Sequence, residues 1–159
     1  MDKIRPTFLT VLCILTFIGS GFAIYSAITS YTTADVTAGM TKDALNNAMD
    51  EIENEAETEK GAEFANKIIG AVSGSLTVET IRNSALASGI SAILTLIGAI
   101  LMWGLDKKGF WLYVIGTAVG VVAPIIIYGG FVGAISSSGV AFIGVIFCVL
   151  YGVNLKHMR

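Results

Sequence analysis

Four long stretches of this sequence contain neither a charged residue nor a histidine, and they constrain the fold more than any other feature. A helix needs roughly 20 residues to cross the hydrocarbon core of a bilayer. A charge at the centre of such a helix costs about 2.5 to 3.5 kcal/mol, so uncharged runs of this length indicate transmembrane helices. Continuous rather than alternating apolar residues exclude a β-barrel. The predicted spans are 7–29, 84–105, 110–130 and 134–153.

Composition supports an all-α membrane protein with four transmembrane helices. Of the 159 residues, 54% are hydrophobic and only 14% are charged, whereas soluble domains carry about a quarter charged residues. The first span exceeds the roughly 7 to 15 apolar residues of a cleavable signal, so we expect a retained anchor. The other segments are 1–6, 30–83, 106–109, 131–133 and 154–159.

Charge is distributed unevenly between the two ends of the predicted spans. The segments 1–6, 106–109 and 154–159 together carry a net charge of +4, whereas the segment 30–83 carries −6. Basic residues favour the cytoplasmic side of a membrane. We therefore expect a multi-pass protein with both termini and the 106–109 turn in the cytoplasm, and with the acidic segment outside.

The acidic segment 30–83 is predicted to form a helical cap. Apolar residues recur every three or four positions from Thr41 to Lys60, where Gly61 interrupts the pattern, and again from Phe64 to Val72. This spacing predicts two short amphipathic helices folded over the outer mouth of the bundle. A further helical stretch is expected to begin near Thr77 and to continue into the second span.

A cluster of carboxylates in the cap leaves three interpretations open. It does not match an EF-hand, because Ala56 stands where the loop requires glycine if counting starts at Glu51. The cluster is a solvated face, a surface for a basic partner or a calcium site. Its members are Asp50, Glu51, Glu53, Glu55, Glu57 and Glu59.

Small residues in the spans predict close approach between helix backbones. Gly116 and Gly120 form a GxxxG pattern in the third span. Such residues pack helices within one chain or dock the chain to another membrane protein. The candidates for either role are Gly19, Gly21, Gly89, Gly116, Gly120, Gly139 and Gly144.

Pro124 predicts a kink in the third span, because it cannot donate a hydrogen bond to the carbonyl of Gly120. Such a kink is either static or a hinge. Cys13 and Cys148 lie at matching depths near the cytoplasmic side, and we interpret them as small buried hydrophobes.

Residues that commonly carry catalysis are scarce. The single histidine, His157, lies in the C-terminal segment, and the segment 30–83 has no cysteine. This composition argues against disulfide oxidases and intramembrane proteases, and we predict no enzymatic activity, cofactor, metal or nucleic-acid partner. The polar candidates for a path through the membrane are Ser20, Ser26, Ser88, Ser91, Thr95, Tyr113 and Thr117.

Two stretches carry a resemblance to other proteins. They are Arg5 to Gly21, RPTFLTVLCILTFIGSG, and Met102 to Tyr113, MWGLDKKGFWLY. They resemble small uncharacterised four-helix integral membrane proteins of Bacteroidota. The resemblance implies a bacterial cytoplasmic (inner) membrane and carries no activity or site residues.

Two functions fit these features. The first is a non-enzymatic accessory or scaffold subunit of a larger inner-membrane complex, such as a protein export or secretion machine, with other integral membrane proteins as partners. The second is a small channel or solute transporter with an uncharged path lined by Ser, Thr and Tyr.

Overall fold

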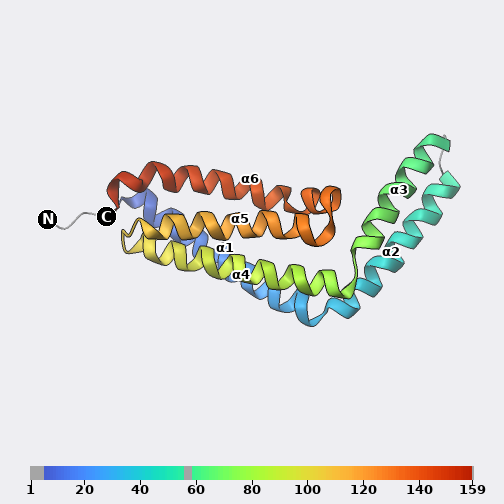
Figure 1. The fold of residues 1–159 in the computed structure, drawn as a ribbon, viewed down its shortest axis with the longest axis horizontal. Coiled ribbons are helices and arrows are strands. Elements are labelled where there is room, and N and C mark those ends of the chain that lie inside the picture. Colours follow the sequence, from blue (N-terminus) through green and yellow to red (C-terminus); the bar gives the residue numbers. More distant parts are fainter. Residues whose placement is uncertain (1–5, 56–58, 159) are drawn as a thin grey trace.

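The computed structural model describes residues 6–55 and 59–158, and all regular secondary structure in these ranges is helical (Figure 1). A pair of more polar helices separates the first long apolar helix from the other three. The elements are α1 (Thr7–Thr32), α2 (Ala34–Glu55), α3 (Glu59–Ser75), α4 (Val78–Trp103), α5 (Lys108–Tyr128), α6 (Gly130–Asn154) and a short 3₁₀ helix, η1 (Leu155–His157).

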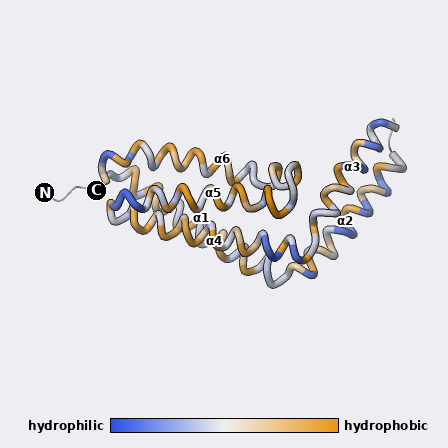
Figure 2. Tube along the Cα trace, in the orientation of Figure 1, coloured by the Kyte–Doolittle hydropathy of each residue, from blue (hydrophilic) through white to orange (hydrophobic). Residues whose placement is uncertain are grey.

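The four predicted spans correspond to α1, α4, α5 and α6, each of which is long and apolar enough to cross a membrane. Hydrophobic residues dominate these helices along their length (Figure 2). The expected helical start near Thr77 is confirmed, because Thr77 caps α4 and its side chain accepts a hydrogen bond from the Thr80 amide. The α5–α6 connection is shorter than predicted, since Gly129 alone separates the two helices.

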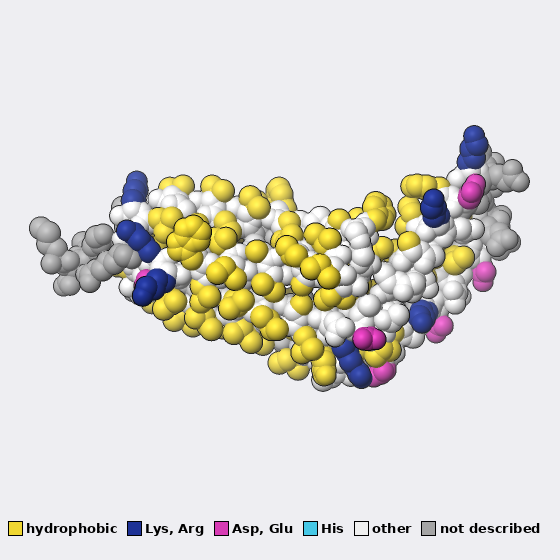
Figure 3. Space-filling model, viewed as in Figure 1, with side chains coloured by type: hydrophobic (Ala, Val, Ile, Leu, Met, Phe, Trp, Pro, Cys, Tyr) yellow, Lys and Arg dark blue, Asp and Glu magenta, His cyan; other side chains and the backbone are white. Residues whose placement is uncertain are grey.

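The long helices pack in the spatial order α1, α4, α5, α6. α4 lies against both α1 and α5, α5 lies against α6, and α1 makes few contacts with α6. The start of α1, the end of α6 and the α4–α5 turn share one end of the bundle (Figure 1). Basic side chains gather at this end (Figure 3). We call it the basic end.

The α4–α5 turn at the basic end is closed by backbone hydrogen bonds. The amide of Leu105 donates to the carbonyl of Met102 at 2.9 Å. The amide of Asp106 donates to the carbonyl of Leu101 at 3.0 Å. This is a Schellman motif, with Leu105 in the left-handed region that glycine usually occupies. The Asp106 carboxylate then accepts a hydrogen bond of 2.9 Å from the Lys108 amide. α5 can therefore begin directly after the turn.

Glycines bring α4 and α5 into close contact. A Cβ atom added at Gly116 would lie 2.9 Å from the Thr95 amide nitrogen and from Leu94 Cβ, and one at Gly120 would lie 2.7 Å from Ser91 Oγ. A Cβ at Gly144 of α6 would clash with Thr117. The GxxxG pair and Gly144 therefore serve packing within this chain.

Helices α2 and α3 pack against each other as a hairpin that extends beyond the bundle end opposite the basic end (Figure 1). The prediction of two helices is confirmed, but they project away from the bundle and do not fold over its mouth. They are also longer than expected. Gly61 lies inside α3 and does not interrupt it, because a single glycine in a helix costs only about 1 kcal/mol.

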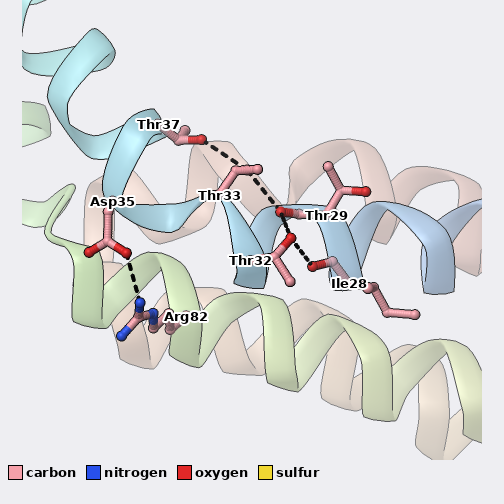
Figure 4. A network of polar contacts seen from close by, with 7 residues as sticks. All are labelled: Ile28, Thr29, Thr32, Thr33, Asp35, Thr37 and Arg82. Atoms are coloured by element: carbon pink, nitrogen blue, oxygen red, sulfur yellow. Dashed lines mark hydrogen bonds and ion pairs between the residues drawn. The ribbon is translucent and has the colours of Figure 1, made fainter.

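A bend at Thr33 joins α1 to α2 (Figure 4). The hydroxyls of Thr32 and Thr33 donate to the carbonyl of Thr29 at 3.0 and 2.8 Å, a pattern that often bends helices. Arg82 of α4 then forms an ion pair of 2.8 Å with Asp35 at the start of α2. The bend and the ion pair account for the direction in which the hairpin leaves the bundle.

Candidate binding cleft between α1 and α6

α1 and α6 meet near the basic end through Thr16 and Tyr151, beside Tyr113 of α5. The hydroxyls of Thr16 and Tyr151 lie 2.7 Å apart, within hydrogen-bonding distance. The Tyr151 ring packs edge-on against Tyr113, with ring centroids 5.0 Å apart. Beyond this layer the basic end is filled by Leu9, Leu12, Cys13, Met102 and Met158, which are all buried. The basic end of the bundle is therefore sealed by apolar packing.

Between this seal and the hairpin lies a cleft of about 840 Å³. α1 and α6 form its walls, α4 and α5 form its floor, and Thr37 and Thr41 at the base of the hairpin border its other end. The volume lies within the range of roughly 300 to 1,000 Å³ that is typical of small-molecule sites. The cleft is thus large enough for an organic solute.

Most polar side chains that line the cleft carry hydroxyl groups. None of the described residues that line it is charged. Fourteen lining residues carry a hydroxyl, and they come from α1, α2, α4, α5 and α6. They are Thr16, Ser20, Ser26, Ser30, Thr37, Thr41, Ser84, Ser88, Ser91, Thr95, Tyr113, Thr117, Tyr128 and Ser136.

All seven polar residues singled out from the sequence as a path through the membrane line this one cleft. Sequence reasoning missed the other seven, although a spacing signal for some of them was present. Ser84, Ser88, Ser91 and Thr95 recur every three or four residues and therefore share one face of α4. The same spacing relates Thr16 to Ser20 in α1.

Hydroxyls in the middle of the cleft are paired within the chain. Ser20 Oγ lies 3.2 Å from Thr95 Oγ1 and connects α1 to α4. Ser91 donates to the carbonyl of Gly116 at 2.7 Å and connects α4 to α5. These hydrogen bonds hold the floor and one wall together.

Three of the predicted packing glycines are not used inside the bundle. Cβ atoms added at Gly19, Gly21 or Gly139 would meet nothing within 4 Å, and Gly19 and Gly139 line the cleft. Gly89 is different, because a Cβ there would lie at an ordinary 3.6 Å from Ala27 Cβ. The small-residue faces of α1 and α6 therefore remain open.

Pro124 lies inside α5, which continues to Tyr128. Its carbonyl and the Ile125 backbone approach α6 at Gly133, where no side chain would fit. Pro124 thus lies at a tight α5–α6 contact, and its role as a kink or hinge stays a prediction.

Both cysteines lie near the seal. Cys13 is buried in the apolar cluster, and Cys148 packs against the same cluster. Their placement in one cluster agrees with the matching depths expected from the sequence.

The acidic residues lie at the end of the hairpin far from the cleft. Asp50 and Glu51 are exposed on α2, Glu53 and Glu55 end that helix, Glu59 begins α3, and Glu57 lies outside the described residues. Within the described ranges, no three His, Cys, Asp or Glu side chains are grouped closely enough to hold a metal ion. The three interpretations of the cluster stay open.

No model of a known protein family matches this chain, and neither does any curated protein or solved structure at a significant level of similarity. The geometry of the cleft therefore carries the functional argument.

Proposed function

We propose that this protein is a small, non-enzymatic transporter of the bacterial cytoplasmic membrane that takes up an uncharged solute in the cleft between α1 and α6. In this proposal both termini face the cytoplasm, and the α2–α3 hairpin lies outside. The observation that carries it is the convergence of 14 hydroxyl-bearing residues, with no charged residue among those described, on one cleft; 12 of them lie in the four apolar helices.

The lining favours neutral solutes over ions. Ion-coupled transporters place ionisable side chains inside the membrane, and transfer of an unpaired ion into an uncharged site is costly. Hydroxyls instead replace the hydrogen bonds that a neutral polar solute loses when it leaves water. The cleft would then be an outward-facing site that is closed at the basic end by the Thr16–Tyr151 contact.

Flux through reconstituted vesicles tests this function. Purified full-length protein would be placed in liposomes, and uptake of radiolabelled glycerol, sorbitol and inositol would be compared with uptake of sodium and chloride. We expect uptake of at least one neutral solute above that of empty vesicles and no ion flux. Vesicles that take up none of the neutral solutes would contradict transport.

A matched pair of variants connects flux to the cleft. Gly139 lines the cleft and has open space at its Cβ position, so the ring of Gly139→Phe should occupy the cleft. Ser138 is exposed and does not line the cleft. Ser138→Phe is therefore the control. Flux that falls with Gly139→Phe and persists with Ser138→Phe would support the cleft as the path.

A specific observation favours a second candidate, an accessory subunit of a larger inner-membrane complex such as an export or secretion machine. Gly19, Gly21 and Gly139 leave small-residue surfaces uncovered, and transmembrane helices use such surfaces to associate. Crosslinking with mass spectrometry in native membranes would identify a partner helix. Recovery of this chain alone after mild-detergent purification would count against the role.

A further inference from the structure

We infer that the half of the cleft nearest the hairpin is a recognition subsite for a neutral polyol, formed by the hydroxyls of Ser26, Ser84 and Ser88. This inference rests on the proposed function and names its substrate class. Hydroxyls along the cleft differ in their hydrogen bonding.

Hydroxyls deeper in the cleft already have partners. Thr16 pairs with Tyr151, Ser20 pairs with Thr95, and Ser91 donates to a backbone carbonyl of α5. These groups stabilise contacts between helices. They therefore have less capacity left for a ligand.

Three serines nearer the hairpin, Ser26, Ser84 and Ser88, have no hydrogen-bond partner in the described part of the chain, although they line the same cleft. Serines in helices commonly donate to the carbonyl one turn earlier, as Ser136 does to Val132 at 2.8 Å. Ser26 and Ser88 are exposed, and Ser84 is partly exposed. At membrane depth an unpaired hydroxyl is unfavourable, so water or a polar ligand must satisfy these groups.

These three residues lie along the α1–α4 contact and line the same cleft. Ala27 faces Gly89, where an added Cβ would lie 3.6 Å from Ala27 Cβ. Ser26 and Ser88 each precede one member of this pair. Ser84 lies one helical turn from Ser88 on the same face of α4.

The chemistry of this set selects its ligand. Each serine hydroxyl both donates and accepts a hydrogen bond, so a matching ligand presents donors and acceptors together. A polyol carries a hydroxyl on every carbon, and each hydroxyl both donates and accepts a hydrogen bond. With no charged residue among the described lining of the cleft, a carboxylate on the ligand would lack a counter-charge. Sorbitol should therefore bind better than gluconate, which has the same carbon chain and one negative charge.

Binding to the full-length protein in detergent micelles tests the subsite without any transport step. Equilibrium dialysis with radiolabelled sorbitol would compare the wild type with the triple variant Ser26→Ala, Ser84→Ala, Ser88→Ala. Loss of three hydrogen bonds should raise Kd by about tenfold or more. The control is Ser138→Ala, whose hydroxyl donates to the carbonyl of Ile135 outside the cleft. Circular dichroism and thermal unfolding would verify that every variant is folded.

The outcomes separate this inference from the proposed function. Sorbitol binding that the triple variant loses and Ser138→Ala retains would support the subsite, even if vesicles showed no flux and transport were refuted. Binding that the folded triple variant retains would overturn the subsite, even if transport were observed. Absence of sorbitol binding to the wild type, or equal affinity for gluconate, would also overturn it.

Discussion

The hydroxyls of Thr16 and Tyr151 lie 2.7 Å apart and connect α1 to α6 at the point where these helices meet. Both residues are buried. Away from this contact towards the hairpin, α1 and α6 form opposite walls of the cleft. The pair therefore defines where the cleft ends.

Removing this hydrogen bond should weaken the closed end. We expect Tyr151→Phe to lower the free energy of unfolding by about 0.5 to 1.5 kcal/mol, because the ring packing remains and only the hydroxyl contact is lost. Thermal unfolding in detergent would measure the change. Tyr25→Phe, at an exposed position on α1, is the matched control. Equal stability of Tyr151→Phe and the wild type would contradict the importance of this contact.

Two glycine-to-alanine substitutions should have opposite effects on stability. Gly116→Ala should destabilise the protein by about 1 to 3 kcal/mol, because its Cβ would meet the α4 backbone at Thr95. Gly139→Ala should be neutral or stabilising by up to about 1 kcal/mol, because its Cβ meets nothing and alanine favours a helix. Both would be measured by unfolding in the same detergent. A loss of stability confined to Gly139→Ala would contradict the packing described for α4 and α5.

The ion pair between Asp35 and Arg82 should contribute little to stability. Its side chains are 65% and 43% exposed, and exposed ion pairs contribute roughly 0 to 1 kcal/mol. We expect Asp35→Asn to lower the free energy of unfolding by less than about 1 kcal/mol, with a smaller effect in high salt. Unfolding at two salt concentrations would test this. A large loss that salt does not reduce would show that the pair does more than orient the hairpin.

Thiol labelling of intact cells would test the proposed orientation. In a background with Cys13→Ala and Cys148→Ala, the exposed positions Asp43 of α2 and Lys107 of the α4–α5 turn would be replaced one at a time by cysteine. We expect a membrane-impermeant maleimide to label Asp43→Cys in intact cells and to label Lys107→Cys only after permeabilisation. The reverse labelling pattern would show that the termini lie outside and the hairpin lies in the cytoplasm.

Features that depend on short-range energetics were predictable from the sequence. Four uncharged runs indicated the long helices, and the start of α4 near Thr77 followed from local patterning and agrees with the observed cap. The direction of the hairpin was not predictable. It depends on the backbone conformation at Thr33 and on the pairing of Asp35 with Arg82, which lie far apart in the chain.

The sequence by itself determined which segments are apolar helices and which hydroxyl-bearing residues they carry, because the cost of placing a charge in lipid depends on each segment alone. Only the tertiary structure decided that Ser20 of α1, Ser91 of α4 and Thr117 of α5 line one cleft. The physical reason is that helix order in lipid depends on close contacts between distant residues. Gly116 approaches Thr95 and Gly144 approaches Thr117, whereas Gly139, with the same side chain, approaches nothing.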